Sequence, residues 1–104
     1  MSTWYLYMIR TRNGSLYTGI ATDVARRFAE HQEEGRKCAR YLRGKAPLQM
    51  VFERKIGSRS LALKVEGQIK RLPKPQKEDI VRSNTSSKEL IAMIALDESS
   101  SIPI

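Results

Sequence analysis

The sequence predicts a single α+β domain in which helices flank a small three-stranded antiparallel sheet, in the order β-β-α-β-α-α. The turn pair Asn13-Gly14 stands between two short apolar runs, which is the strongest local signal for a β-hairpin. Later segments carry apolar residues at helical spacing, and this predicts amphipathic helices that cover the sheet. A chain of 104 residues is long enough for one hydrophobic core and little more.

Three short segments have the composition of strands. Residues 4–9 are all apolar or aromatic, too few for a typical helix and rich in strand-forming types, so we expect a buried strand. Residues 16–20 form the returning strand of the hairpin. Residues 48–56 alternate weakly between apolar and polar types and predict the third strand.

The length of the hairpin loop decides which side chains share a face of the sheet. A two-residue loop, Asn13-Gly14, would place Tyr7 and Tyr17 on opposite faces. A three-residue loop with Gly14 in the left-handed bulge position would instead pair Tyr7 with Gly19 and put both tyrosines on one face. The two tyrosines can therefore belong to one site only with the longer loop or an equivalent bulge.

Capping and breaking residues delimit the helices. Thr22 or Asp23 can cap a helix that runs to about Glu34, where Gly35 is expected to end it. Further helices are expected over residues 58–72, 75–82 and 86–95.

Positive charge is concentrated in the first four fifths of the chain. The formal net charge is +8, and residues 1–82 hold 18 Lys and Arg against 8 Asp and Glu. We expect a main domain over residues 1–83, followed by a C-terminal helix and a disordered, serine-rich tail over residues 84–104. Such a basic domain is typical of proteins that bind DNA or RNA, although a solvated basic surface without a partner explains the charge equally well.

A cationic loop follows the first expected helix. Its candidate nucleic-acid contacts are Arg36, Lys37, Arg40, Tyr41, Arg43 and Lys45. An aromatic ring among basic side chains suits a phosphate backbone with a base nearby. A mobile loop, or a short helical turn with Tyr41 and Leu42 packed inward, is an equally good interpretation.

Several classes of protein are disfavoured by the composition. The N-terminus lacks the basic run of a signal peptide, and no apolar stretch approaches membrane-spanning length, so we expect a soluble, cytoplasmic protein with no membrane partner. The single cysteine, Cys38, excludes an internal disulfide and any multi-cysteine zinc site.

Three charged or titratable side chains occupy suggestive helix positions. Arg27 and His31 are four residues apart, so they share a helix face. Glu66 lies at the border of the apolar stripe of its helix, from where a carboxylate can reach into a cleft. On spacing alone, however, an ion pair with Lys70 is the commoner use of such a glutamate, and strand tyrosines taken singly more often pack than react.

The order of these residues resembles the GIY-YIG nuclease superfamily, especially its short stand-alone bacterial members of the UPF0213 type. The resemblance covers residues 4–80. It rests on the motifs Tyr5-Leu6-Tyr7 and Tyr17-Thr18-Gly19, followed by Arg27, His31 and Glu66. In this resemblance Tyr7, Tyr17 and Gly19 match motif residues of the superfamily. Arg27 and His31 match its helix Arg-x-x-x-His arrangement, and Glu66 matches its metal-binding glutamate.

The sequence departs from the superfamily pattern at a few positions. Tyr5 replaces the first glycine of the family name and Thr18 replaces an isoleucine, and the superfamily tolerates both changes. Ile20 stands where some members carry a lysine or another polar residue, which removes one possible cation near the attacking group. Asn84 is a weak match for a late asparagine of certain members.

The resemblance implies an endonuclease that hydrolyses DNA phosphodiester bonds with one divalent metal, Mg²⁺ or Mn²⁺, in DNA repair or processing. Arg27 would hold the phosphoryl oxygens, Glu66 would bind the metal, and Tyr7 or Tyr17, helped by His31, would take the proton of the attacking water. Two alternatives stay open. One is a nucleic-acid-binding module with weak or no turnover, and the other is an adaptor that binds another protein through its last helix and acidic tail.

Overall fold

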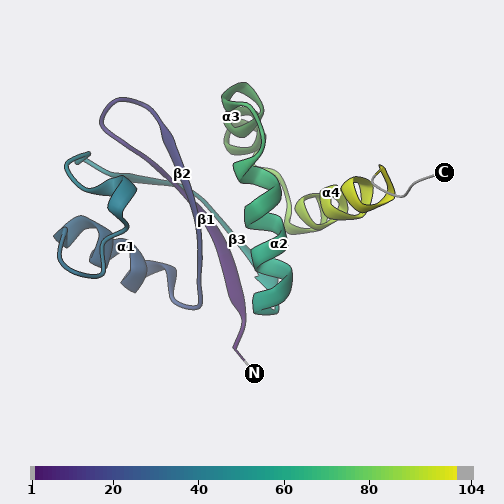
Figure 1. Cartoon of the computed structure of the whole chain (residues 1–104), viewed down its shortest axis with the longest axis horizontal. Helices are drawn as coiled ribbons and strands as arrows, with labels where there is room; N and C mark the ends of the chain where they lie inside the picture. Colours follow the sequence, from purple (N-terminus) through teal and green to yellow (C-terminus); the bar gives the residue numbers. More distant parts are fainter. Residues whose placement is uncertain (1, 101–104) are drawn as a thin grey trace.

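A computed structural model of the chain describes residues 2–100, with side chains described over residues 2–94. The sheet is built from β1 (Trp4–Arg10), β2 (Leu16–Ala21) and β3 (Gln49–Gly57). The helices are α1 (Val24–Glu33), the short 3-10 helix η1 (Arg40–Leu42), α2 (Arg59–Lys70), α3 (Lys74–Ser83) and α4 (Ser87–Ser100). The predicted α+β fold class and the predicted order of elements are confirmed (Figure 1).

The sheet is antiparallel throughout, with strand order β2-β1-β3, so β1 is central and β2 is an edge strand. The hairpin has the three-residue loop. Gly14 has φ +87°, and its N–H donates to the carbonyl of Thr11 at 2.9 Å. Tyr7 accordingly pairs with Gly19, and Tyr7 and Tyr17 project from the same face. Glycine is required at this turn because other residues rarely adopt a positive φ.

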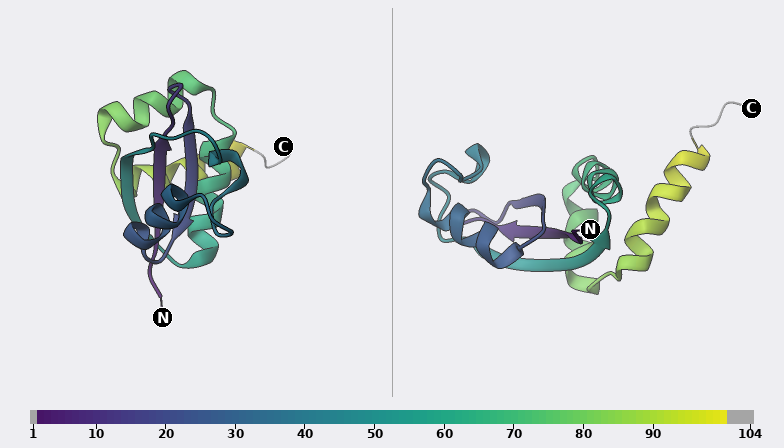
Figure 2. Two further views of the ribbon diagram at one scale, coloured as in Figure 1. Left: turned by 90° about the vertical axis from the view of Figure 1, so that its left-hand side faces the viewer. Right: turned by 90° about the horizontal axis from the view of Figure 1, so that it is seen from below.

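Each face of the sheet packs against a different hydrophobic cluster. Leu6 and Met8 of β1 are buried against α2 and α4 and belong to the larger hydrophobic core. Tyr7 and Ile9 alternate with them and face the smaller cluster formed with α1 and the η1 segment. Figures 1 and 2 show α1 on one side of the strands and the later helices on the other.

Side-chain caps begin α1 and α2 where the sequence predicts them. The Asp23 carboxylate accepts the N–H of Arg26 at 3.1 Å, and the Ser58 hydroxyl accepts the N–H of Leu61 at 3.1 Å. The end of α1 differs from the prediction, because Glu34 itself takes the left-handed conformation, with φ 53°, one residue before Gly35. Its N–H closes the helix on the carbonyl of His31, so glycine is not what ends α1.

The C-terminal helix is longer than expected. α4 continues to Ser100, past the predicted end at residue 95, because no proline or glycine interrupts it there. Of the serine-rich end of the chain, for which we expect disorder, the residues up to Ser100 are helical and residues 101–104 lie outside the described residues. Leu90 and Ile94 of α4 are buried in the larger core. Over residues 2–100, no helix is long and apolar enough to cross a membrane.

Replacement of Ile69 by alanine tests the larger core. Ile69 is 0% exposed, and we expect Ile69→Ala to lower the free energy of unfolding by about 2–5 kcal/mol, because it leaves a cavity between α2 and the sheet. Leu63→Ala is the matched control on the same helix. Leu63 is 40% exposed, and its truncation should change the stability by about 0.5 kcal/mol or less. Urea denaturation measures both, and equal losses would contradict the assigned core.

Candidate active site

The Tyr7 side chain crosses the neighbouring strand at Gly19. Tyr7 is 1% exposed, and a Cβ atom built on Gly19 would lie 2.5 Å from the Tyr7 hydroxyl oxygen and 2.6 Å from the ring carbon that carries it. Real Cβ contacts of this length do not occur, so any other residue at this position would displace the tyrosine. The glycine of the second motif is therefore required by a close approach and not by its φ.

The Tyr7 hydroxyl is held by His31 of α1. The hydroxyl oxygen lies 2.9 Å from His31 Nε2, and His31 is completely buried. The other ring nitrogen, Nδ1, accepts the backbone N–H of Ala39 at 3.2 Å. Since an N–H can only donate, Nδ1 carries no proton in this bond, and a neutral His31 must carry its proton on Nε2. His31 thus donates to Tyr7, and the proton of Tyr7 remains available for another acceptor.

Burial determines the protonation states of this pair. Burial and, to a smaller extent, the neighbouring Arg27 charge together lower the pKa of His31 to about 4 although Glu30 opposes them, so the imidazole is neutral at pH 7. Burial also raises the pKa of Tyr7 well above its ordinary value. Tyr17 and Glu66 act in the same direction, whereas Arg27 opposes them. Tyr7 is therefore a neutral phenol unless further positive charge reaches it.

Tyr17 closes an aromatic cluster around the Tyr7 hydroxyl. Its ring centroid lies 6.3 Å from that of Tyr7, 5.6 Å from that of His31 and 5.9 Å from that of Tyr41. The contact with His31 is edge-on and that with Tyr41 is stacked. The structure thus brings the tyrosines of the two motifs into one cluster, as the longer hairpin loop predicts.

The Arg27 guanidinium is oriented by its own helix and by the loop that follows. Its Nη1 donates to Glu30 Oε1 at 3.0 Å and to the backbone carbonyl of Lys37. About a third of the side chain is exposed, so the planar donors can still reach a ligand. The guanidinium charge lowers the pKa of both Tyr7 and His31, so Arg27 lies close enough to the buried pair to act on it electrostatically.

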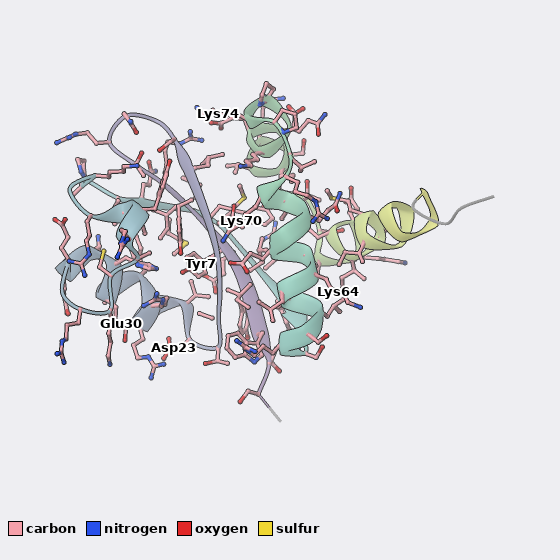
Figure 3. All side chains as sticks on the ribbon, in the orientation of Figure 1. Tyr7, Asp23, Glu30, Lys64, Lys70 and Lys74 are labelled. Atoms are coloured by element: carbon pink, nitrogen blue, oxygen red, sulfur yellow. The ribbon has the colours of Figure 1, made fainter. Side chains whose placement is uncertain are left out.

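Glu66 reaches the cluster from α2, which packs along the edge strand β2. Its side chain is 17% exposed, and Oε2 lies 3.3 Å from Nζ of Lys70. The ion pair anticipated from the four-residue spacing is therefore present. Lys70 Nζ lies 6.0 Å from the centre of the Tyr17 ring, and the Glu66 charge acts on Tyr7. Figure 3 shows Lys70 on the side of α2 that faces the strands and Tyr7.

The residues around Glu66 suit a weakly chelated cation. No group of three or more His, Cys, Asp and Glu that could hold a metal occurs over the part of the chain that the structure describes. Glu66 alone would be the protein ligand, with water and substrate oxygens completing the shell. Such a shell is typical of Mg²⁺ and Mn²⁺, which keep several waters and bind phosphate directly.

The basic loop is divided between structural and exposed roles. Arg43 donates to the carbonyls of Glu34 and Gly35, and Lys37 pairs with Glu30 at 3.7 Å. Arg36 and Arg40 are exposed.

Part of the alternative interpretation of this loop holds. Residues 40–42 form the short helical turn η1, and Leu42 is fully buried in the smaller core. Tyr41, in contrast, is 46% exposed and stacks on Tyr17, with Nζ of Lys45 lying 3.4 Å from its ring centre. Tyr41 and Lys45 are thus the two loop candidates that lie next to the aromatic cluster.

Two features of the site had no clear signal in the sequence. The backbone N–H of Ala39 sets the tautomer of His31, and no side-chain pattern reveals it. Lys77 lines a hollow beside Tyr17, and α3 is held there by a bidentate pair between Arg10 of β1 and Glu78, with N···O distances of 2.8 and 2.7 Å. Lys70, which the sequence indicates only as the ion-pair partner of Glu66, also lines this hollow.

The weak candidate Asn84 has a local structural role. It ends α3 in the left-handed conformation, and its side-chain oxygen accepts a hydrogen bond from Arg54. These contacts account for Asn84 without the site.

Comparison with known proteins identifies the family. Residues 3–79 match the model of the GIY-YIG catalytic domain. The chain is 50% identical over 94 residues to a UPF0213 protein of Citrobacter koseri, covering 90% of this chain and 92% of that one. It is 46% identical over 98 residues to the UPF0213 protein YhbQ of Escherichia coli, covering 94% and 96%. The chain therefore belongs to the GIY-YIG family and, within it, to the UPF0213 proteins.

A solved structure agrees with this assignment. The solution NMR structure of a UPF0213 protein from Bacillus halodurans is similar, with 35% identity and a TM-score of 0.50. The similarity covers 77% of this chain and 83% of the other.

Replacement of Gly19 by alanine tests the close approach of Tyr7. We expect Gly19→Ala to lower the free energy of unfolding by about 1–3 kcal/mol, because the new methyl group overlaps the Tyr7 hydroxyl. The His31 ring signals in a ¹⁵N NMR spectrum should shift as the Tyr7 bond breaks. Gly67→Ala is the matched control. It meets nothing within 4 Å and should stabilise α2 by about 0.5–1 kcal/mol. Unchanged His31 signals in Gly19→Ala would contradict the geometry.

The pH dependence of stability tests the buried histidine. An unfolded histidine protonates near pH 6.5, whereas folded His31 does so only near pH 4. Between these values the unfolded state binds more protons, so the free energy of unfolding should fall as the pH is lowered, by up to about 3 kcal/mol. Urea denaturation of wild type and His31→Gln at several pH values isolates this effect. Parallel pH profiles for the two proteins would rule it out.

Proposed function

We propose that this protein is a metal-dependent endonuclease that hydrolyses DNA phosphodiester bonds and acts in DNA repair or processing. One observation carries the proposal. The Tyr7 hydroxyl is hydrogen-bonded to His31 and lies over Gly19. The charges of Arg27 on α1 and of Glu66 on α2 both act on the pKa of Tyr7. A general base beside a phosphate-binding cation and a metal-binding carboxylate is what phosphodiester hydrolysis requires.

The chemistry assigned to Arg27 and Glu66 follows from their charges. Arg27 offers planar, permanently charged donors for the phosphoryl oxygens, on which negative charge grows in the transition state. Glu66 would hold a single Mg²⁺ or Mn²⁺, which when bound would polarise the scissile phosphate. Lys70 must then leave Glu66, because the ion and the ammonium compete for the same carboxylate.

Tyr7 is assigned the proton of the attacking water, with His31 as its positioning residue. His31 carries its proton on Nε2 and donates a hydrogen bond to the Tyr7 hydroxyl, so His31 is not itself the base. The same bond stabilises a Tyr7 phenolate. Because burial raises the Tyr7 pKa, the phenolate forms only when cationic charge is added near it, which links base activation to occupation of the site. Tyr17 packs against both groups and limits their movement.

Replacement of Glu66 separates an enzyme from a binding module. With Mg²⁺ or Mn²⁺, wild type should cleave at least one member of a panel of single-stranded, duplex and branched DNA. Glu66→Gln should abolish cleavage yet leave DNA binding largely intact, and Arg27→Ala should reduce the rate by roughly 10²-fold or more. Glu33→Gln, an exposed change on α1, is the charge-matched control and should cleave like wild type.

Two outcomes would overturn the nuclease proposal. One is full activity of Glu66→Gln. The other is DNA binding by wild type without cleavage of any substrate with either metal, which would leave a binding module.

A further inference from the structure

A hollow lies directly beside the active site, against the edge strand β2. It has a volume of about 310 Å³ and is lined by Leu16, Tyr17, Thr18, Tyr41, Lys70 and Lys77. These residues come from four parts of the chain, namely β2, η1, α2 and α3. Only Tyr17 also belongs to the aromatic cluster around the Tyr7 hydroxyl, so the hollow adjoins the reactive groups without containing them.

One wall of the hollow is aromatic. Tyr17 and Tyr41 stack with an angle of 23° between their rings, and Tyr41 keeps 46% of its surface exposed. Lys45 lies over the Tyr41 ring but does not line the hollow, so its ammonium covers that ring from outside. A flat group that stacks on the Tyr41 ring would therefore take the place of the Lys45 ammonium, and aromatic side chains of this kind stack well on bases.

The lining of the hollow is also cationic. Lys70 and Lys77 both line the hollow, and none of its lining residues is acidic among those whose side chains the structure describes. Lys77 makes no ion pair with any residue whose side chain is described, over residues 2–94, whereas Lys70 pairs with Glu66. Figure 3 shows Lys70 on the side of α2 toward the strands and Lys64 on the opposite side. An anion in the hollow would therefore meet Lys77 first, and Lys70 once Glu66 is engaged elsewhere.

We propose that this hollow binds one unpaired nucleotide of the substrate strand, next to the phosphate that is cleaved. The base lies against the wall of Tyr17 and Tyr41, and its phosphate lies between Lys70 and Lys77. The proposal rests on the proposed nuclease function, because it places the nucleotide relative to the reactive groups. It adds a selectivity, namely that the substrate carries a single-stranded segment at the site.

The dimensions and chemistry of the hollow favour one nucleotide over a base pair. Its volume lies at the lower end of the roughly 300–1,000 Å³ range of small-ligand sites. A base that is paired and stacked in a duplex has no free face for the tyrosine wall, and taking it out of the stack requires energy. An unpaired base offers its face without that requirement, and stacking on an aromatic side chain is tolerant of base identity.

Binding of fluorescent DNA in EDTA tests the subsite without cleavage. The probes are a blunt duplex, the same duplex with a single-stranded overhang, and the single strand alone, measured by fluorescence anisotropy at several salt concentrations. Wild type should bind the overhang at least tenfold more tightly than the blunt duplex. Tyr41→Ala should lose this preference, and Tyr41→Phe should keep it because the ring remains.

Lysine variants test the cationic wall. Lys77→Ala should weaken binding of the single strand and reduce the slope of log affinity against log salt by about 0.7, the value for one lost phosphate contact. Lys64→Ala removes the same charge from the far side of α2 and is the matched control. Both the preference for the overhang and the slope of log affinity against log salt should be larger in Lys64→Ala than in Lys77→Ala.

The outcomes separate the subsite from the nuclease function. Equal binding of overhang and blunt duplex, a preference that survives in Tyr41→Ala, equal effects of Lys77→Ala and Lys64→Ala, or no binding of any probe would each overturn the subsite. Cleavage without any overhang preference would leave the nuclease function standing and remove the subsite. If the protein cleaves nothing but prefers the overhang through Tyr41, the subsite would stand and the nuclease function would be overturned.

Discussion

The close approach of the Tyr7 hydroxyl to the backbone of Gly19 is the constraint on which the site depends. It needs two glycines for different reasons. Gly14 allows the left-handed bulge that gives the hairpin its register, and Gly19 leaves the space that the tyrosine occupies. With the shorter loop, alternation along the strand would place Tyr7 and Tyr17 on opposite faces, and no local adjustment would bring them together.

The sheet separates stability from chemistry. One face is covered by α2 and α4 and holds an almost entirely apolar core, whereas the other holds buried polar groups that satisfy one another. No buried side-chain polar atom among the described residues lacks a hydrogen-bond partner. The buried tyrosine and histidine stay neutral, because burial raises the pKa of Tyr7 and lowers the pKa of His31, which disfavours the charged form of each. Arg27 and Glu66, by contrast, lie at the partly exposed border of the site, where each makes an ion pair.

Ion pairs connect the layers around the site. The bidentate pair of Arg10 and Glu78 ties the hairpin to α3. Its hydrogen bonds, together with Lys74, lower the pKa of Glu78 to about 2 although burial acts in the opposite direction. This contact places α3, and with it Lys77, beside the edge strand. The Glu66–Lys70 pair keeps a cation next to Tyr17. The same side chains thus set both the packing and the charge of the surface around the site.

The sequence by itself determined the fold class, the elements and most of the residues that gather at the site. Local signals carried this information: the Asn13-Gly14 turn, the Asp23 cap and the four-residue spacing of Arg27 and His31 act within a few residues of one another. The tertiary structure alone decided the loop length, the tautomer of His31 and the position of Lys77. The loop length goes with the left-handed Gly14 and the packing of Tyr7 on Gly19, and the tautomer depends on the backbone N–H of Ala39, eight residues after His31. The position of Lys77 depends on the contact of Arg10 with Glu78, which are 68 residues apart. Such contacts leave no periodicity in the sequence, because their geometry exists only after the layers have packed.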